Sequence, residues 1–308
     1  MKPQLQVPAA VAIAALLVGA CAFFQNTREA RYPLSEDTEE SLYITSGKTL
    51  ARLTRGYNAI AADLYWIRTI QYYGGTKRKA ATSGAQAAGI DYKLLYPMLD
   101  LTTTLDRRFN IAYRFGAIFL AEAPPGGPGR PDLAIALLQK GLSERPDKWE
   151  YMQDIGFVHY WWRHDYTAAA RWFNRAADTP GAPWWLRSLA ASTLAEGGDR
   201  RASRQIWEQL RETAEVDWLR HDAERKLLQL RALDDIDALQ SVVDRFTAAS
   251  GRPPGGWEPI VRAGLLRGTP IDPAQTPYEI DAAGRIHVSM KSPLFPLPEE
   301  PQRLPPAS

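Results

Sequence analysis

The chain has 308 residues, of which 45% are hydrophobic, and its 37 Lys and Arg residues nearly balance its 35 Asp and Glu residues. This apolar content is ordinary for a folded protein and excludes an intrinsically disordered chain. The net charge of +2 is too balanced to indicate a nucleic-acid-binding protein or a polybasic membrane patch.

Residues 8–24 form an apolar segment without a charged residue. Its length is at the short limit for a membrane span and also suits the hydrophobic region of a signal peptide. We expect residues 1–30 to anchor the chain as a single span in the inner membrane, with residues 25–308 on the extracytoplasmic, periplasmic side. Alternatively, Val18-Gly19-Ala20-Cys21 resembles a bacterial lipoprotein cleavage box, in which Cys21 would be lipidated. Simple cleavage and a buried helix are also open.

Residues 31–90 read as a polar spacer, a helix and a loop. Apolar residues recur in steps of three and four from Leu50 to Tyr73, which predicts a long amphipathic helix. Residues 74–89 lack this period and contain the basic run 77–79, which predicts a mobile loop. Gly47-Lys48-Thr49 resembles the end of a phosphate-binding loop, but Leu42 stands where that motif needs a glycine. No nucleotide site is therefore predicted.

Residues 91–250 carry a repeated pattern of small and apolar residues, each copy closing on a proline. The first copy is Ala134, Leu138, Gly141 and Pro146, and the second is Ala169, Phe173, Ala176 and Pro180. Small residues on one helix face let a neighbouring helix approach closely, and the proline ends the helix. The pattern predicts pairs of antiparallel helices, with a sharp turn at Gly198. A last pair is expected over residues 216–233 and 236–249.

The units at residues 116–146 and 156–180, with a third pair around Gly198, resemble tetratricopeptide repeats. That family places a small residue in the first helix, an Ala early in the second and a proline at the end. The resemblance implies an all-α fold, a TPR-like α-solenoid whose groove binds an extended peptide or a partner helix. More loosely, an N-terminal anchor before such repeats is similar to membrane-anchored bacterial tetratricopeptide proteins of envelope machinery, such as type IV pilus or export systems.

The resemblance also supplies candidate binding residues, because the first helices of the pairs line the groove in that family. These candidates are Tyr113, Arg114, Gln153, His159, Tyr160 and Arg187. Aromatic and guanidinium side chains of this kind would contact the backbone or a carboxylate of a bound partner.

The C-terminal part, residues 251–308, differs in character from the repeats. A short helix is expected after residue 256, and alternating residues on both sides of Gly284 predict a β-hairpin. An isolated hairpin is marginal in water, so it should pack on the last helices or pair with a partner's strand. The proline-rich tail, residues 293–308, is expected to be extended, either as a spacer or as a ligand for an aromatic surface.

Motifs of enzymes and metal sites are missing from the sequence. The four His residues form no His-x-x-x-His pair, and no Gly-x-Ser-x-Gly elbow or dinucleotide glycine pattern is present. His164-Asp165 falls where a turn is required, so we expect a turn and a helix cap there. We predict that the protein is not an enzyme and that it binds no cofactor, metal, nucleic acid or small-molecule substrate. We expect it to bind a protein or peptide partner in the cell envelope. An envelope enzyme acting on glycan, or a lipoprotein assembly factor, is the alternative.

Overall fold

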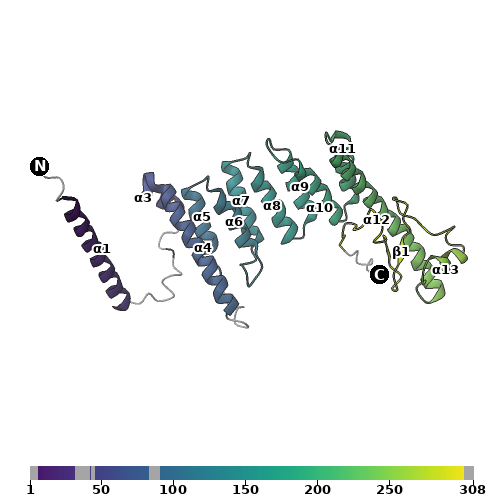
Figure 1. The fold of residues 1–308 in the computed structure, drawn as a ribbon, viewed down its shortest axis with the longest axis horizontal. Coiled ribbons are helices and arrows are strands. Elements are labelled where there is room, and N and C mark those ends of the chain that lie inside the picture. Colours follow the sequence, from purple (N-terminus) through teal and green to yellow (C-terminus); the bar gives the residue numbers. More distant parts are fainter. Residues whose placement is uncertain (1–5, 32–41, 43–45, 83–90, 302–308) are drawn as a thin grey trace.

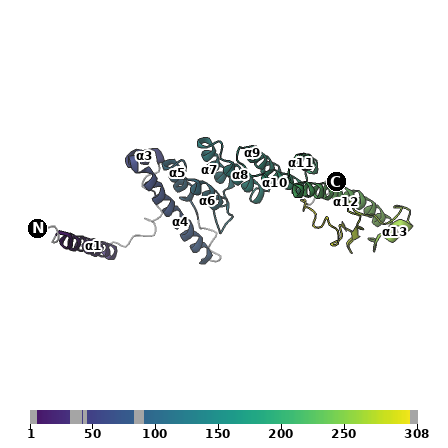
Figure 2. The same cartoon turned by 45° about the horizontal axis from the view of Figure 1, so that its top comes forward.

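The computed structural model describes residues 6–31, 42, 46–82 and 91–301. These residues are mostly helical, with one small two-stranded sheet near the C-terminal end. Figure 1 shows α3 to α12 standing side by side in one row, with α1 set apart at the N-terminal end. In the turned view of Figure 2 the row is extended, and α12 runs toward the C-terminal end of the row. The expected all-α class is confirmed.

Helix α1 (Gln6–Arg31) contains the predicted apolar segment. Its window Val11–Arg28 is long and apolar enough to cross a membrane, and none of that window is buried within the protein. A helix of 26 residues is about 39 Å long, which exceeds the roughly 30 Å of a bilayer's hydrocarbon core. The structure thus agrees with a single N-terminal span or a signal sequence.

Helices α3 (Gly47–Thr54) and α4 (Asn58–Thr82) follow, joined by the short 3₁₀ turn η1 (Arg55–Tyr57). The predicted loop at residues 74–89 is wrong in its first half, because α4 continues to Thr82. Buried Ala80 and an ion pair of Lys77 with Glu122, at 2.8 Å, hold this last part of the helix in place. Residues 83–90 lie outside the described part of the chain, as does most of the acidic spacer.

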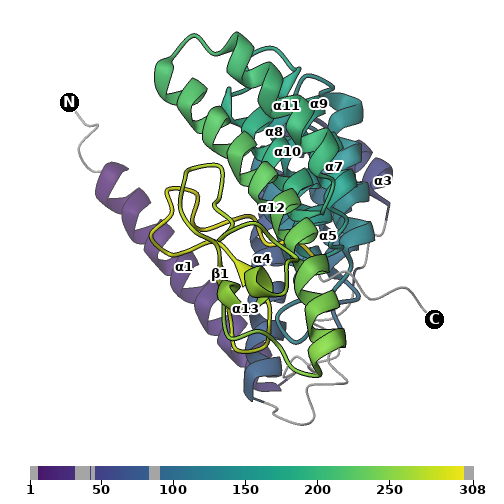
Figure 3. The same ribbon diagram turned by 90° about the vertical axis from the view of Figure 1, so that its right-hand side faces the viewer.

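Seven further helices form the row, and each packs against the next along the chain. They are α5 (Leu95–Leu105), α6 (Asn110–Ala121), α7 (Pro131–Glu144), α8 (Trp149–Trp161), α9 (Tyr166–Ala177), α10 (Trp185–Glu196) and α11 (Arg200–Thr213). Viewed along the row in Figure 3, α12 crosses the view, with the C-terminal segment on one side of it and α7 and α9 on the other. The small residues of the repeated pattern lie in the core, where Ala134, Ala169 and Ala176 are fully buried.

The turns between these helices are formed as the sequence predicts. The Asp165 side chain accepts a hydrogen bond from the backbone N–H of Ala168 at 2.9 Å and so caps α9. Asp199 caps α11 in the same way, through the N–H of Ala202 at 3.0 Å. Gly198 has a φ of +79°, which L side chains rarely adopt. The turn and cap role expected for His164-Asp165 is confirmed.

Helix α12 (Asp217–Ser250) corrects the prediction of a last helix pair. The two expected helices are one, because residues 217–250 contain no Gly or Pro that could break the hydrogen-bonded ladder. The helix ends only at Gly251, whose φ of +72° gives the left-handed conformation typical of a helix C-terminus.

The C-terminal segment packs on the second half of α12. It contains α13 (Trp257–Arg262) and the antiparallel strands β1 (Glu279–Ile280) and β2 (Ile286–His287), with Ile280 opposite Ile286. The Gln240 amide donates to the carbonyl of Gly284 at 2.9 Å and accepts from the N–H of Ile286 at 3.1 Å. The predicted hairpin is therefore present and packs on the chain's own helix.

Candidate functional site

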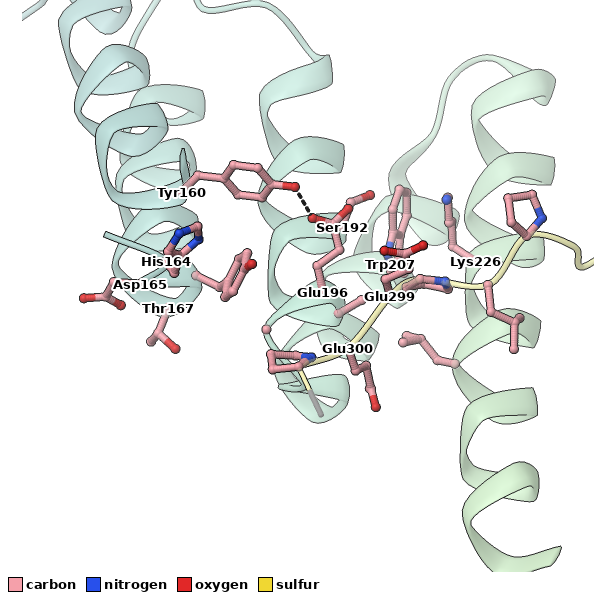
Figure 4. Close-up of a pocket in the computed structure, with 18 residues that line it drawn as sticks. Tyr160, His164, Asp165, Thr167, Ser192, Glu196, Trp207, Lys226, Glu299 and Glu300 are labelled. Atoms are coloured by element: carbon pink, nitrogen blue, oxygen red, sulfur yellow. Dashed lines mark hydrogen bonds between the residues drawn. The ribbon is translucent and has the colours of Figure 1, made fainter. Parts of the chain in front are cut away.

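A hollow of about 910 Å³ opens between helices α8 to α12 and the C-terminal residues 296–301. We call it the groove. Figure 4 shows that side chains from these helices point into the groove and that the C-terminal segment crosses it without regular secondary structure. The polar and aromatic side chains that line the groove include Tyr160, His164, Ser192, Glu196, Trp207 and Lys226.

Residues 292–301, which we call the tail segment, are held to α12 through their backbone carbonyls. Arg225 donates from Nε to the carbonyl of Pro293 at 3.0 Å and from Nη2 to that of Phe295 at 3.2 Å. The buried Gln229 amide donates to the carbonyls of Leu294 at 2.8 Å and Pro296 at 2.7 Å. Prolines have no N–H to offer, so carbonyl-directed donors suit a proline-rich segment. Such contacts recognise a peptide backbone rather than particular side chains.

A charged clamp fixes the far end of the tail segment. Arg200, at the start of α11, donates from Nε and Nη2 to the two carboxylate oxygens of Glu300, at 2.5 Å and 2.6 Å. Its Nη1 also contacts Asp234 at 3.0 Å and Asp237 at 2.8 Å on α12. The hydrogen bonds to Glu300 and to these aspartates raise the pKa of Arg200 although burial opposes the charge. Only 10% of the Arg200 side chain is exposed, so its guanidinium forms a desolvated, bidentate binding site for a carboxylate.

The opposite wall of the groove comes from α8 and α10. The Tyr160 hydroxyl donates a hydrogen bond to the Glu196 carboxylate. This bond, together with burial, raises the pKa of Tyr160 to about 12. The indole of Trp207 is buried at the base of the groove. The wall therefore offers an aromatic surface and a carboxylate beside the tail segment.

Of the six candidate binding residues, Tyr160 lines the groove. The prediction that Tyr113 lines a binding groove is wrong, because its side chain is fully buried. Its ring packs against Tyr151, and its hydroxyl donates to the carbonyl of Thr103 at 3.3 Å. The side chain faces the core because position 113 shares a helix face with buried Ala117.

The remaining candidates do not meet at the groove. Arg114 forms two hydrogen bonds with Asp154 of α8, at 2.6 Å and 3.0 Å, and so joins α6 to α8. Arg187 pairs with Asp178 at 2.6 Å, and Gln153 is half-buried on α8.

His159 is half-buried, and burial lowers its pKa. Its Nδ1 lies 3.9 Å from the nearer Asp165 oxygen, too far for a hydrogen bond. Contact of this residue, or of Arg114, Gln153 and Arg187, with a partner stays a prediction. Lipidation of Cys21, which is exposed on α1, does as well.

Sequence reasoning missed the residues that hold the tail segment, namely Arg200, Arg225 and Gln229. The only two signals were the acidic residues Glu299 and Glu300 in a proline-rich tail and an arginine-rich stretch at residues 200–204. Helical periodicity does not relate residues a hundred positions apart, so their pairing needed the folded chain.

Within the described ranges, no group of three or more His, Cys, Asp and Glu side chains could hold a metal ion. No family model, curated protein or solved structure matches this chain.

Proposed function

We propose that this protein is a membrane-anchored scaffold whose helix pairs form a TPR-like solenoid and bind an extended peptide segment of a partner protein. The anchor is α1, and the partner is a component of an extracytoplasmic envelope assembly or export system, with residues 25–308 on the periplasmic side. The single observation that carries the proposal is the tail segment itself. An irregular, proline-rich peptide lies against the helices, held by donors to its carbonyls and by a carboxylate clamp.

The repeat pattern supports the solenoid part of the proposal. Small residues recur at the helix contacts, and a Cβ at Gly116, Gly141 or Gly156 would overlap side chains of neighbouring helices. Pro146 and Pro180 follow the ends of α7 and α9. Stacked pairs of this kind bury one continuous core and leave an elongated face, which suits the binding of an extended chain.

Peptide binding is tested by supplying the tail segment in trans. Deletion of residues 295–308 opens the groove and keeps Leu294, which is buried in the C-terminal core. We expect a fluorescently labelled peptide of residues 295–301 to bind the shortened protein, as measured by anisotropy. Arg200→Gln should weaken binding by about tenfold or more, because a charge-assisted hydrogen bond contributes roughly 1.5–3 kcal/mol.

Arg211→Ala is the matched control, because Arg211 is an exposed arginine near the end of the same helix. No binding to the shortened protein, or an equal loss in both arginine variants, would contradict the proposal. In cells, a photo-crosslinking residue at Ser192 in the groove should give a discrete crosslinked product with a partner, whereas one at exposed Glu212 should not.

A further inference from the structure

Helices α4 and α6 present large apolar side chains to solvent. On α4 and its preceding turn these are Tyr57, Ile60, Leu64 and Ile67, and on α6 they are Ile111, Phe115 and Ile118. Each of the seven side chains is between 46% and 72% exposed. We call this set the α4–α6 apolar face. Exposed apolar groups gathered in this way mark an interaction surface.

The two helices turn these residues to the same side of the protein. Both α4 and α6 pack on α5, and the exposed residues lie opposite the buried ones, such as Ala62 on α4 and Ala117 on α6. The helices also touch each other, since the Trp66 ring stacks on that of Phe119 with 6.1 Å between the centroids. The exposed residues therefore form one surface over two neighbouring helices.

The segment that contains α3 and α4 is strongly basic. Residues 46–82 contain seven Lys and Arg residues and one acidic residue, Asp63, in a chain that is nearly neutral overall. Lys48, Arg52, Arg55 and Arg78 are exposed. Arg78 follows Ile60 by eighteen residues, which is about five helical turns, so it continues the line of the apolar residues along α4. An apolar helix face flanked by basic residues is typical of helices that lie in a membrane interface.

The position of α1 favours a lipid surface over a second copy of the chain. Only residues 32–46 connect the end of α1 to α3, and fifteen residues span at most about 50 Å. The apolar face is therefore tethered close to whichever membrane α1 enters. In a symmetric pair of chains the basic residues around the face would oppose like charges, whereas anionic headgroups complement them.

We propose that the α4–α6 apolar face lies on the anionic lipid headgroups of the membrane that α1 spans. This inference rests on the membrane anchoring included in the proposed function. The aliphatic side chains and Phe115 insert at the boundary of headgroups and acyl chains, and the exposed Lys and Arg side chains contact lipid phosphates. The N-terminal end of the row is thereby fixed against the membrane, and the groove lies toward the other end.

The test uses the full-length protein reconstituted in vesicles, with Cys21→Ser so that one introduced cysteine carries an environment-sensitive fluorophore. Leu64→Cys reports on the apolar face, and Glu212→Cys on exposed α11 is the matched control. Vesicles contain either phosphatidylcholine alone or added phosphatidylglycerol, each with brominated acyl chains as quencher. We expect a blue shift and quenching at position 64, stronger with phosphatidylglycerol, and neither at position 212. Arg52→Glu combined with Arg55→Glu should reduce the quenching severalfold.

Each outcome separates the inference from the anchoring. Protein that floats with vesicles but shows no quenching at position 64 overturns the inference and leaves the anchor intact. Protein that does not float overturns the anchor, and the inference with it. A blue shift that depends on protein density, without quenching by brominated lipid, identifies a second copy as the occupant and also overturns the inference.

Discussion

Gly156 lets two helices of the row meet without a side chain between them. It lies on α8, where an added Cβ would overlap the ring of buried Phe173 on α9. Phe173 has little room to yield, because it packs among Met152, Ala169 and other buried residues. The sequence pattern predicted that small residues let paired helices approach closely, and Gly156 beside Phe173 is such a close approach.

We predict that Gly156→Ala lowers the free energy of unfolding by about 1–3 kcal/mol, because overpacking forces the ring or the helices apart. Gly74→Ala is the control, because Gly74 lies in an exposed part of α4 with no atom near the added Cβ. There the better helix propensity of Ala should raise the free energy of unfolding by about 0.5–1 kcal/mol. Urea denaturation followed by Trp fluorescence measures both. Equal effects of the two substitutions would refute the close approach at Gly156.

Tyr113 and Tyr160 show what residue type alone cannot decide. Both are aromatic residues on first helices of the predicted pairs, and both were candidates for the groove. Tyr113 is fully buried, whereas Tyr160 lines the groove. The two residues lie on different faces of their helices relative to the neighbouring helices. A periodic pattern locates helices better than it assigns the face that is left open.

At the scale of elements, helix α12 binds the tail segment through side-chain hydrogen bonds. Gln229 is buried, and its amide donates to two tail carbonyls, those of Leu294 and Pro296. Leu294 is buried in the C-terminal core, whereas residues 296–301 of the tail segment have no regular secondary structure and are held by side-chain contacts such as these. Its attachment should therefore be lost without unfolding the helices.

We predict that Gln229→Leu, which keeps the side-chain volume similar but removes the donors, releases the tail segment. Glutamyl endopeptidase should then cleave after Glu299 faster than in the unchanged protein, while circular dichroism stays the same. Gln209→Leu, at an exposed position of α11, should leave the cleavage rate unaltered. A similar rate in all three proteins would show that Arg200 and Arg225 hold the segment without Gln229.

Helix boundaries were predicted well where a capping Asp or a following Pro marks them and poorly at α4 and α12. Helix α9 begins directly after the predicted turn and cap at His164-Asp165 and ends shortly before Pro180, which closes the second copy of the pattern. The prediction failed for α4 and α12, since one continues past Gly74 and the other runs through residues 233–236. At α4, the burial of Ala80 and the ion pair of Lys77 with Glu122 outweigh the low helix propensity of glycine, whereas at α12 no Gly or Pro interrupts the helix. The groove depends on contacts between α11, α12 and the tail segment, and no local sequence pattern predicts such contacts.

At the scale of the whole molecule, overall composition conceals how charge is distributed. A net charge of +2 suggested no basic membrane patch, yet residues 46–82 alone carry six more basic than acidic residues, seven against one. The excess lies in the part of the row that directly follows α1. Charge counted over separate segments would have shown this from the sequence.

We predict that removal of residues 1–31 abolishes flotation with neutral phosphatidylcholine vesicles but leaves the thermal midpoint of the helical row unchanged. The apolar side chains of α1 from Val11 to Phe24 are exposed, so they contribute little to the cores of the row. Differential scanning fluorimetry of both proteins provides the measurement. A clear fall in the midpoint would show that α1 packs on the row.

The tail segment also sets the conditions under which the groove is free. A segment joined to its own site is present there at a local concentration of the order of millimolar, whatever the abundance of the protein. An external peptide that uses the same contacts must compete with it, and its apparent dissociation constant equals the intrinsic value divided by the fraction of open grooves. If the groove binds a partner as proposed, weak encounters are thereby rejected, and occupancy requires a peptide that binds more tightly than the chain's own end or that is held close by a shared membrane.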